Sequence, residues 1–392
     1  MSETADLVVV GGGIIGCAVV RSLASLLPRT TRILLLDRGP IAGATSGSCM
    51  GHLMVTPENA QEFAFTRTSV RLWSELAEEI GGFHHNPTGV LYLADDDEDL
   101  ELLPVLRAQF EANGEQCEVL DAAELRRHEP GLAESVPGGL HYRHDGVVLP
   151  MLAAGAMLRA ARRDCDHVVV RPECAVVGFD RDGGRVTAVR TERGTIGAGA
   201  VVCAAGVWSP ELAAMLGLPP LPIFPRAGNL AITAHHTSPI RMQLLEISYL
   251  RTAHGATDVD PAGGSDPGAH AVNMQPQSHG GCLIGSTRQF RGMDRTLNEA
   301  LLRRSLRRAA RYAPALAGLP IVRTWVGLRP YCSDGHPLIG PWPGLEGLWI
   351  ATGHEGLGIT LAPITGLLLA QQIAGQATEI DHHPYLPARF LS

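Results

Sequence analysis

A glycine-rich segment near the N-terminus has the residue types and spacing needed to hold a pyrophosphate. Gly11, Gly13 and Gly16 form a G-x-G-x-x-G string after an apolar run at 7–10, and Asp37 follows Gly16 by 21 residues. Glycines let a phosphate approach backbone N–H groups at the positive end of a helix, and a carboxylate one strand later can accept ribose hydroxyls. The pattern predicts a dinucleotide site. Asp37 disfavours a 2′-phosphate, but the pattern alone does not separate NAD from FAD.

The elements around this site follow from the apolar pattern. Residues 7–10 and 33–37 are continuous apolar runs, typical of strands in a parallel sheet covered on both faces, and a helix is predicted from the glycines through residue 26. A second glycine pair, Gly197 and Gly199, precedes the strand predicted at 201–203 and lacks a third glycine at the required spacing. It therefore does not predict a second dinucleotide site.

The rest of the chain alternates between helical and strand patterns. Helical spacing predicts helices over 57–80, 96–112, 150–162 and 298–312, and apolar runs predict strands over 90–93, 168–170, 175–177, 201–203, 272–277 and 282–285. Residues 252–270 are rich in turn-forming residues and predict a long loop. The arginines of the helix at 298–312 are expected to form a solvated face.

The composition excludes several kinds of chemistry. The chain has 392 residues, enough for two ordinary domains, and all 32 basic residues are arginine because the sequence contains no lysine. A pyridoxal enzyme needs a Schiff-base lysine and a P-loop needs its own lysine, so both are excluded. The net charge of −8 argues against a nucleic-acid partner.

Cysteine spacing and apolar runs predict the setting of the protein. The 8 cysteines form no C-x-x-C pair, which argues against zinc, an iron–sulfur cluster and a dithiol site, so no metal is predicted and the thiols are expected to be reduced. The apolar run at 7–10 lacks the basic start of a signal peptide, and the one at 359–373 is too short and too interrupted to span a bilayer. A soluble, cytoplasmic protein is expected.

Five segments of the chain carry distinctive motifs. They are the glycine string with Asp37, then Gly43-Ala-Thr-Ser46, Val201-Val-Cys-Ala-Ala-Gly-Val-Trp-Ser209, Gly327-Leu-Arg-Pro-Tyr-Cys-Ser-Asp-Gly-His-Pro-Leu-Ile-Gly340 and Ala351-Thr-Gly-His-Glu-Gly-Leu-Gly-Ile-Thr-Leu-Ala-Pro363. Together they resemble one known group of proteins, the D-amino-acid-oxidase-like FAD-dependent amine and amino-acid oxidoreductases. The resemblance covers about residues 5–375. It implies an α/β fold in which a Rossmann-like FAD-binding domain (1–56, 150–212 and 324–392) is interleaved with a mixed-sheet α+β substrate domain (57–149 and 213–323).

The resemblance also implies a set of FAD-binding residues. These are Gly11, Gly13, Gly16, Asp37, Arg38, Thr45, Ser46, Met50, Gly51, His52, Val176, Ala204, Gly206, Trp208, Arg329, Gly353, Gly356, Leu357, Gly358, Ile359 and Thr360. Hydroxyls of Thr45 and Ser46 can bond the pyrophosphate, and the start of a helix near Ile359 can stabilise the negative charge of reduced flavin. Some relatives bind FAD through a cysteine seven residues before the aspartate of a Ser-Asp turn. Here that position, counted from Asp334, is Gly327, so FAD is expected to be non-covalent.

The same resemblance implies a substrate and a reaction. Arg329, in Gly-Leu-Arg-Pro, is expected to bind the carboxylate of an amino acid or N-substituted amino acid, and His52 and Tyr249 join it as candidate catalytic residues. The expected reaction oxidises the carbon–nitrogen bond by hydride transfer to flavin, giving an imine that hydrolyses. Some relatives activate oxygen with a lysine, which this chain lacks, so oxidase and dehydrogenase both stay open.

Two other functions remain open on the same residues. A 2-hydroxy-acid dehydrogenase could use the same arginine, and a flavin-holding subunit could leave the reaction to a partner. A protein, a quinone and oxygen are the candidate electron acceptors. A homo-oligomer and a dehydrogenase complex are both compatible with the sequence.

Overall fold

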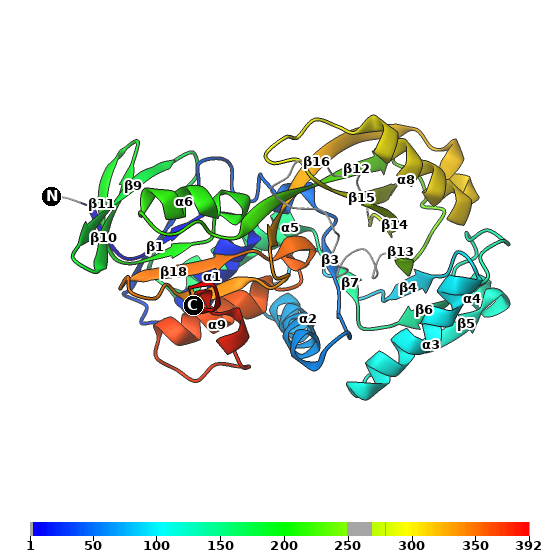
Figure 1. The fold of residues 1–392 in the computed structure, drawn as a ribbon, viewed down its shortest axis with the longest axis horizontal. Helices are drawn as coiled ribbons and strands as arrows, with labels where there is room; N and C mark the ends of the chain where they lie inside the picture. Colours follow the sequence, from blue (N-terminus) through cyan, green and yellow to red (C-terminus); the bar gives the residue numbers. More distant parts are fainter. Residues whose placement is uncertain (1–2, 249–268, 279, 392) are drawn as a thin grey trace.

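The computed structural model describes residues 3–248, 269–278 and 280–391. It contains two eight-stranded sheets, one in each half of an elongated molecule (Figure 1). A two-stranded ribbon, β3 (His52–Leu53) and β7 (Gly146–Val147), lies between them. The α/β fold expected from the sequence is confirmed.

The first sheet is built on the predicted parallel βαβ unit. Its path runs β17 (Leu338–Pro341), β18 (Leu348–Thr352), β11 (Gly194–Cys203), β1 (Glu3–Val10), β2 (Arg32–Leu36) and β8 (His167–Arg171), and β9 (Val176–Asp182) and β10 (Arg185–Thr191) extend from β11. β1 pairs in parallel with β11 and β2, and Val8, Val9, Leu35 and Leu36 are fully buried. Burial on both faces explains why these strands are continuous apolar runs.

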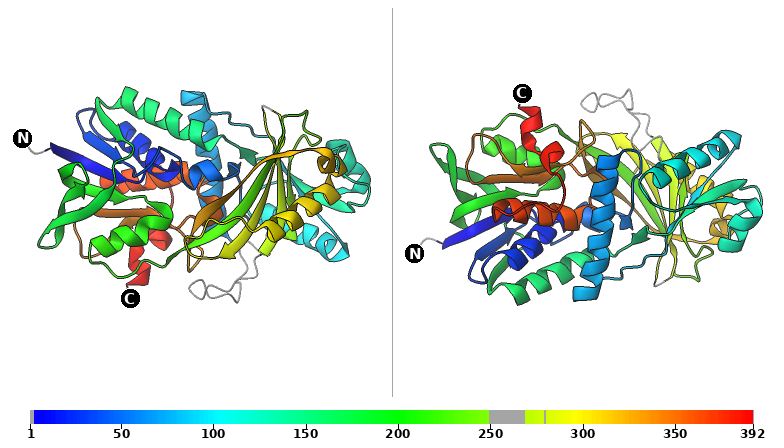
Figure 2. Two further views of the ribbon diagram at one scale, coloured as in Figure 1. Left: turned by 90° about the horizontal axis from the view of Figure 1, so that it is seen from above. Right: turned by 90° about the horizontal axis from the view of Figure 1, so that it is seen from below.

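Helices cover both faces of the first sheet. α1 (Ile14–Leu26) packs against α5 (Pro150–Asp164) and α9 (Ala362–Ile373), while α6 (Ser209–Met215) contacts β9 on the opposite side. Figure 2 shows α2 (Ala60–Ile80) between the two halves, where it packs on α9 and α5. Gly16 is required here, because a Cβ would lie 1.9 Å from the carbonyl oxygen of Gly11.

The second sheet is mixed. Its order is β16 (Ile321–Cys332), β12 (Ile223–Thr233), β15 (Cys282–Phe290), β14 (Ala269–Pro276), β13 (Gln243–Glu246), β4 (Val90–Leu93), β6 (Gly138–Tyr142) and β5 (Glu118–Asp121). Only the pair β13–β4 is parallel among the described strands of this sheet. The long strands β12 and β16 reach back toward the first sheet (Figure 1).

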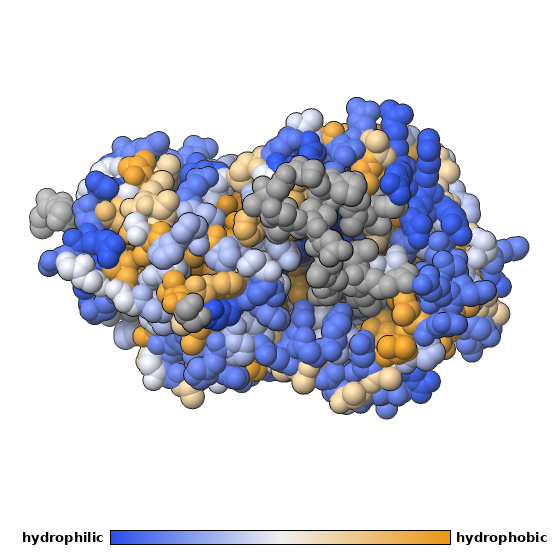
Figure 3. Space-filling view, in the orientation of Figure 1, coloured by the Kyte–Doolittle hydropathy of each residue, from blue (hydrophilic) through white to orange (hydrophobic). Residues whose placement is uncertain are grey.

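Helices and short turns complete the second half. They are α3 (Asp97–Ala112), α4 (Ala122–His128), α8 (Glu299–Tyr312) and the 3-10 turn η3 (Pro314–Gly318), and the first half adds the turns η1 (Ser46–Ser48), η2 (Gly206–Trp208), η4 (Glu355–Leu357), η5 (His383–Tyr385) and η6 (Pro387–Phe390). Arg303, Arg304, Arg307 and Arg311 of α8 are exposed, as predicted, and Figure 3 shows hydrophilic side chains over this helix. Arg308 differs, because it pairs with Glu246 and Asp95.

Several boundaries differ from the prediction, among them the start of β11 at Gly194 and the end of β15 at Phe290, where strands were predicted over 201–203 and 282–285. The helix predicted from Ile359 begins at Ala362, after the turn η4, and most of the loop predicted at 252–270 lies outside the described residues, although 269 and 270 already belong to β14. The division into two domains stays a prediction, and its boundary at 324 falls within β16, a strand of the second sheet.

All eight cysteines are free thiols. No helix in the described part of the chain combines the length and apolar character needed to cross a bilayer.

Candidate active site

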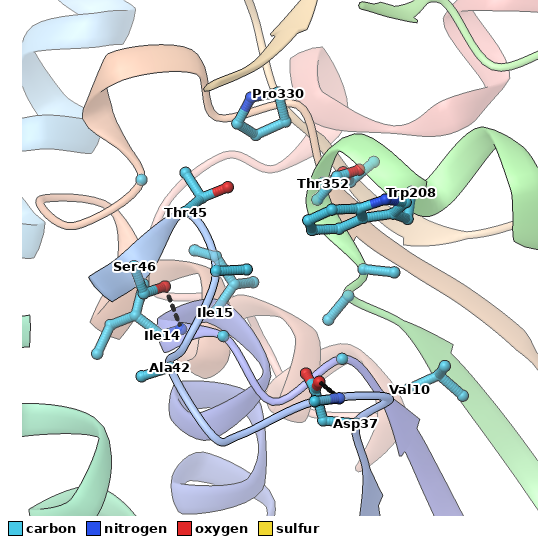
Figure 4. A pocket seen from close by; sticks show the side chains of 18 of the residues that line it. Val10, Ile14, Ile15, Asp37, Ala42, Thr45, Ser46, Trp208, Pro330 and Thr352 are labelled. Atoms are coloured by element: carbon cyan, nitrogen blue, oxygen red, sulfur yellow. Dashed lines mark hydrogen bonds between the residues drawn. The ribbon is translucent and has the colours of Figure 1, made fainter. Parts of the chain in front are cut away.

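A cavity of about 500 Å³ opens at the carboxyl ends of the parallel strands of the first sheet (Figure 4). Val10 of β1, Leu36 of β2, Ala204 after β11 and Thr352 of β18 all lie on its wall. Ligands of open parallel sheets bind at this edge, because loops from adjacent strands diverge there. The cavity is therefore the first candidate for a cofactor site.

The glycine string shapes the floor of this cavity. Gly11 has a φ of +112°, and a Cβ there would lie 2.4 Å from the carbonyl oxygen of Ala204, so only glycine fits. Gly13, the N-cap of α1, has no side chain to cover the helix start, and it lines the cavity with Gly11. Gly16 is not on the wall; it lets α1 pack under Gly11. The cavity thus meets the positive end of α1.

Asp37 lies at the end of the cavity where β2 ends. Its Oδ2 accepts a hydrogen bond from the Gly12 amide at 2.6 Å, and its Oδ1 accepts one from the Gly39 amide at 2.7 Å. Figure 4 shows Asp37 on the wall of the cavity. Each carboxylate oxygen has a further lone pair that can accept a hydroxyl. The carboxylate is therefore held in place with acceptor capacity left for a ribose.

Arg38, Val176, Gly206 and Trp208, which were predicted to bind the cofactor, line the same cavity. The Arg38 guanidinium carbon lies 4.1 Å from the centroid of the Trp208 ring, so the two planar groups form a cation–π pair. Arg38 also lies 3.7 Å from Glu211. These contacts fix a flat surface over this part of the cavity.

The two hydroxyls expected at the pyrophosphate are used differently. Ser46 Oγ accepts a hydrogen bond from the Ile14 amide at 2.9 Å, which satisfies one donor of α1 and leaves the Ser46 proton to be donated. Thr45 Oγ1 instead donates to the carbonyl oxygen of Leu328 at 2.7 Å. In this arrangement Ser46 can donate to a phosphate oxygen, whereas Thr45 holds the loop against β16.

The segment before α9 closes the cavity from the other side. Gly356, Gly358 and Ile359 line it, and the amides of Ile359 and Thr360 donate to no backbone carbonyl of the described residues. Gly353, Leu357 and Thr360 were expected beside the cofactor but are not on the wall. Thr360 Oγ1 accepts from the Met54 amide and donates to the His52 carbonyl, so it positions these residues.

A second cavity of about 60 Å³ continues from the first toward the second sheet. Thr45, Cys49, Arg329, Gly356 and Ile359 line both cavities. Met50, Gly51 and His52 line the smaller one, and Tyr249 lies outside the described residues. The smaller cavity is the candidate for a substrate, because it joins the larger one beside a cation.

Arg329 lies where the two cavities meet. Its Nη1 donates to the carbonyl oxygen of Thr287 at 3.1 Å and its Nη2 to Ser286 Oγ at 2.8 Å. A guanidinium has five N–H donors, so the remaining donors are available to an anion. Gly228 makes room for this group, because a Cβ there would lie 2.7 Å from Nη1.

The other titratable groups of the smaller cavity stay neutral. Burial lowers the pKa of His52 to about 4, although the adjacent Gln275 opposes this shift, and burial raises the pKa of the Cys49 thiol to about 12. Near neutral pH the imidazole is uncharged and the thiol is protonated. Arg329 is then the only charged side chain among the described residues lining this cavity.

Several residues of the site were not predicted. Asn273 and Ser286 line the smaller cavity, and the buried Arg226 contacts Glu355 at 3.2 Å beside it. Burial lowers the pKa of Arg226, and the Glu355 carboxylate opposes that shift. Polar residues inside the apolar run at 272–277 were a usable signal, since buried strands rarely carry them without a partner.

The chain matches the family described as DAO, FAD dependent oxidoreductase, over residues 6–372. The protein belongs to this family. It is 32% identical over 398 residues to a glycine oxidase of Pseudomonas aeruginosa, covering 99% of each chain. It is 29% identical over 432 residues to hydrogen cyanide synthase subunit HcnC of the same organism, covering 100% of this chain and 97% of that one. L-proline dehydrogenase from P. horikoshii has a similar structure, with a TM-score of 0.86, 25% identity and coverage of 100% and 99%.

The family confirms the expected enzyme class and cofactor: the protein is an FAD-dependent oxidoreductase. The larger cavity fits FAD on its own chemistry, because it offers a carboxylate for a ribose, a helix N-terminus for a pyrophosphate and free amides before α9. The roles of the individual residues stay predictions.

Proposed function

We propose that this oxidoreductase oxidises the carbon–nitrogen bond of an amino acid or N-substituted amino acid. The observation that carries the proposal is the position of Arg329, which presents free donors where the cofactor cavity meets a small second cavity. A guanidinium fork matches a carboxylate with two parallel hydrogen bonds. The glycine oxidase relative, named for an amino acid, supports the same substrate class.

The residues of the chain position the substrate and stabilise charge. Bound FAD supplies the acceptor for the two electrons and the hydrogen that leave the carbon next to nitrogen. Arg329 holds the carboxylate, so the reacting carbon is oriented at the junction of the cavities. The free amides of Ile359 and Thr360 favour negative charge near the start of α9. No side-chain base is required when the amine enters deprotonated.

The partners of the protein are part of this proposal. Without a lysine, the chain lacks one kind of oxygen-activating group, which favours a dehydrogenase whose electrons pass to a protein or a quinone. One relative is named as a subunit of hydrogen cyanide synthase, which supports the proposal that this protein functions as a subunit of a dehydrogenase complex. A homo-oligomer is the alternative. A cytoplasmic location is part of the same proposal.

Anaerobic flavin reduction tests the reaction. The purified protein with FAD is mixed with D- and L-amino acids, sarcosine, prolines, opines and 2-hydroxy acids, and bleaching of the flavin is followed. We expect bleaching by at least one amino compound, with release of ammonia or a primary amine. Bleaching only by 2-hydroxy acids, with no nitrogen product, would support the 2-hydroxy-acid alternative. No bleaching by any compound would support a flavin-holding subunit.

One variant and one further measurement make this test specific. Arg329→Ala should raise the substrate Kd by about one to three orders of magnitude, since a charge-assisted pair is lost, and the Kd is measured on protein whose FAD content has been determined. Air is then readmitted to the reduced wild-type protein. A dehydrogenase should leave the flavin reduced for minutes, and rapid reoxidation would identify an oxidase.

A further inference from the structure

Unpartnered polar atoms gather on the side of the smaller cavity formed by the second sheet. Asn273 is 1% exposed and lines the cavity, and its Oδ1 has no hydrogen-bond partner. The Nε2 of His52, which also lines the cavity, is buried as well, and the side chain of Gln275 lies beside this imidazole. Buried polar atoms are nearly always hydrogen-bonded in proteins, so this group calls for a ligand.

The sheet directs these side chains to one place. Asn273 and Gln275 are two residues apart on β14, so they point to the same face, while Met274 between them packs in the core on the other face. Asn273 pairs across the sheet with Gly285, whose missing side chain leaves space filled by Met50. Asn273 therefore faces the cavity that Arg329 also lines, and Gln275 lies behind it on the same face of the strand.

The charges of the cavity restrict what can bind there. Arg329 binds the carboxylate of the substrate. Among the described residues that line the smaller cavity, none has an acidic side chain. His52 is neutral near pH 7, so neither an ammonium nor a second carboxylate would find a counter-ion on the Asn273 side. A hydroxyl or a carboxamide can donate to the side-chain carbonyl oxygen of Asn273 at no such cost.

We propose that the substrate carries, besides its carboxylate, a small uncharged hydroxyl or carboxamide substituent that binds Asn273 and His52. This inference rests on the proposed function for the carboxylate on Arg329, and it adds the substrate class. The cavity of about 60 Å³ admits only a few heavy atoms, since one water needs about 10–15 Å³ of such space. A site built to hydrogen-bond a substrate group rejects the analogue that lacks it.

Binding of carboxylates that cannot be oxidised at a carbon–nitrogen bond tests the inference without turnover. The Kd of 3-hydroxypropanoate and of its isostere butanoate is measured on the FAD-bound protein by calorimetry. We expect the hydroxy acid to bind about 10-fold or more tightly, which one unmatched polar group supports. Equal affinities, or tighter binding of butanoate, would overturn the inference, and this comparison needs no variant to fold.

Two variants at neighbouring positions of β14 test whether Asn273 causes the preference for the hydroxy acid. Asn273→Leu should abolish the preference by weakening the hydroxy acid alone, whereas Met274→Leu, on the opposite face of the same strand, should retain it. FAD content and Tm establish that each variant is folded. Equal weakening of both ligands by Asn273→Leu would mean that Asn273 contacts the carboxylate, which contradicts the proposal.

Turnover separates this inference from the proposed function. Homoserine and norvaline, and serine and 2-aminobutyrate, are compared by kcat/KM for flavin reduction, and we expect the hydroxylated member of at least one pair to be favoured about 10-fold or more. If amino acids reduce the flavin but the alkyl members are equal or better, only the substituent assignment fails. If none reduces it while 3-hydroxypropanoate is still preferred over butanoate, the proposed reaction fails and the pocket assignment stands.

Discussion

Gly228 is the position where a single methyl group should loosen the carboxylate site while leaving the cofactor site intact. A Cβ at Gly228 would lie 2.7 Å and 2.8 Å from the terminal nitrogens of Arg329 and 2.9 Å from the carbonyl oxygen of Thr287. Non-bonded heavy atoms are most favourable at about 3.5 Å or more, so the guanidinium must retreat by roughly 0.8 Å. Gly228 lines the smaller cavity and is absent from the wall of the larger one.

The size of the effect follows from the hydrogen bonds that fix Arg329. Its bonds to the Thr287 carbonyl and to Ser286 Oγ are 3.1 Å and 2.8 Å long, so the retreat breaks or bends at least one of them. A displaced guanidinium no longer forms one of its hydrogen bonds to the bound carboxylate, and a hydrogen bond to a charged group contributes about 1.5–3 kcal/mol, which corresponds to roughly 10- to 100-fold in affinity. Gly228→Ala should therefore raise the Kd of butanoate by that factor, measured by calorimetry on the FAD-bound protein.

Gly318 provides the matched control. A Cβ at Gly318 meets no atom within 4 Å, so Gly318→Ala adds the same methyl group without a contact. Its butanoate Kd should equal that of the wild type, and both variants should retain full FAD content. A Kd of Gly228→Ala within twofold of the wild type, or a loss of FAD that parallels the loss of affinity, would refute the reasoning.

Three further predictions concern the cofactor site and pH. Ser46→Ala should lower the Tm of the FAD-bound protein and weaken FAD binding, because the Ile14 amide loses its acceptor at a cost of about 1 kcal/mol; unchanged values would remove Ser46 from the site. Burial raises the pKa of Asp145 well above its usual value, so the folded state binds the proton more tightly and loses stability as pH rises through that pKa. The Tm of Asp145→Asn relative to wild type should therefore rise from pH 5 to pH 8, and a flat or falling difference in scanning calorimetry would contradict this. Burial holds the pKa of His52 near 4 and that of Cys49 near 12, so the Kd of butanoate should not vary between pH 6 and pH 8. A Kd that falls as the pH is lowered through about 6.5, the usual pKa of histidine, would show that the imidazole becomes charged and would contradict this prediction.

The local part of the cofactor site was predictable from sequence. The glycine string and Asp37 predict a strand, a turn, a helix and a second strand. These elements are neighbours along the chain, so the sequence pattern alone is enough to predict them. Arg329 was found through its motif and lies on the expected cavity wall. The start of α9 was misplaced by three residues because the chain first forms the tight turn η4, and glycine-rich segments give no periodic signal for such turns.

The substrate side of the site depends on pairings that a single sequence does not reveal. β12 carries Pro225 and Gly228, which weaken a strand pattern, and no strand was predicted there. Its pairing with β16 brings Gly228 opposite Gly327 and leaves room for Arg329. Asn273 reaches the cavity only through the order of strands in the second sheet, a non-local property.

The most direct test of the central claim compares amines with and without a carboxylate. Anaerobic flavin reduction is measured with each amino acid that bleaches the wild-type protein and with the amine that lacks only its carboxylate, such as glycine and methylamine or alanine and ethylamine. If Arg329 orients the reacting carbon by holding the carboxylate, the amino acid should reduce the flavin and its amine partner should be slower by at least an order of magnitude. Equal rates within such a pair would contradict the account.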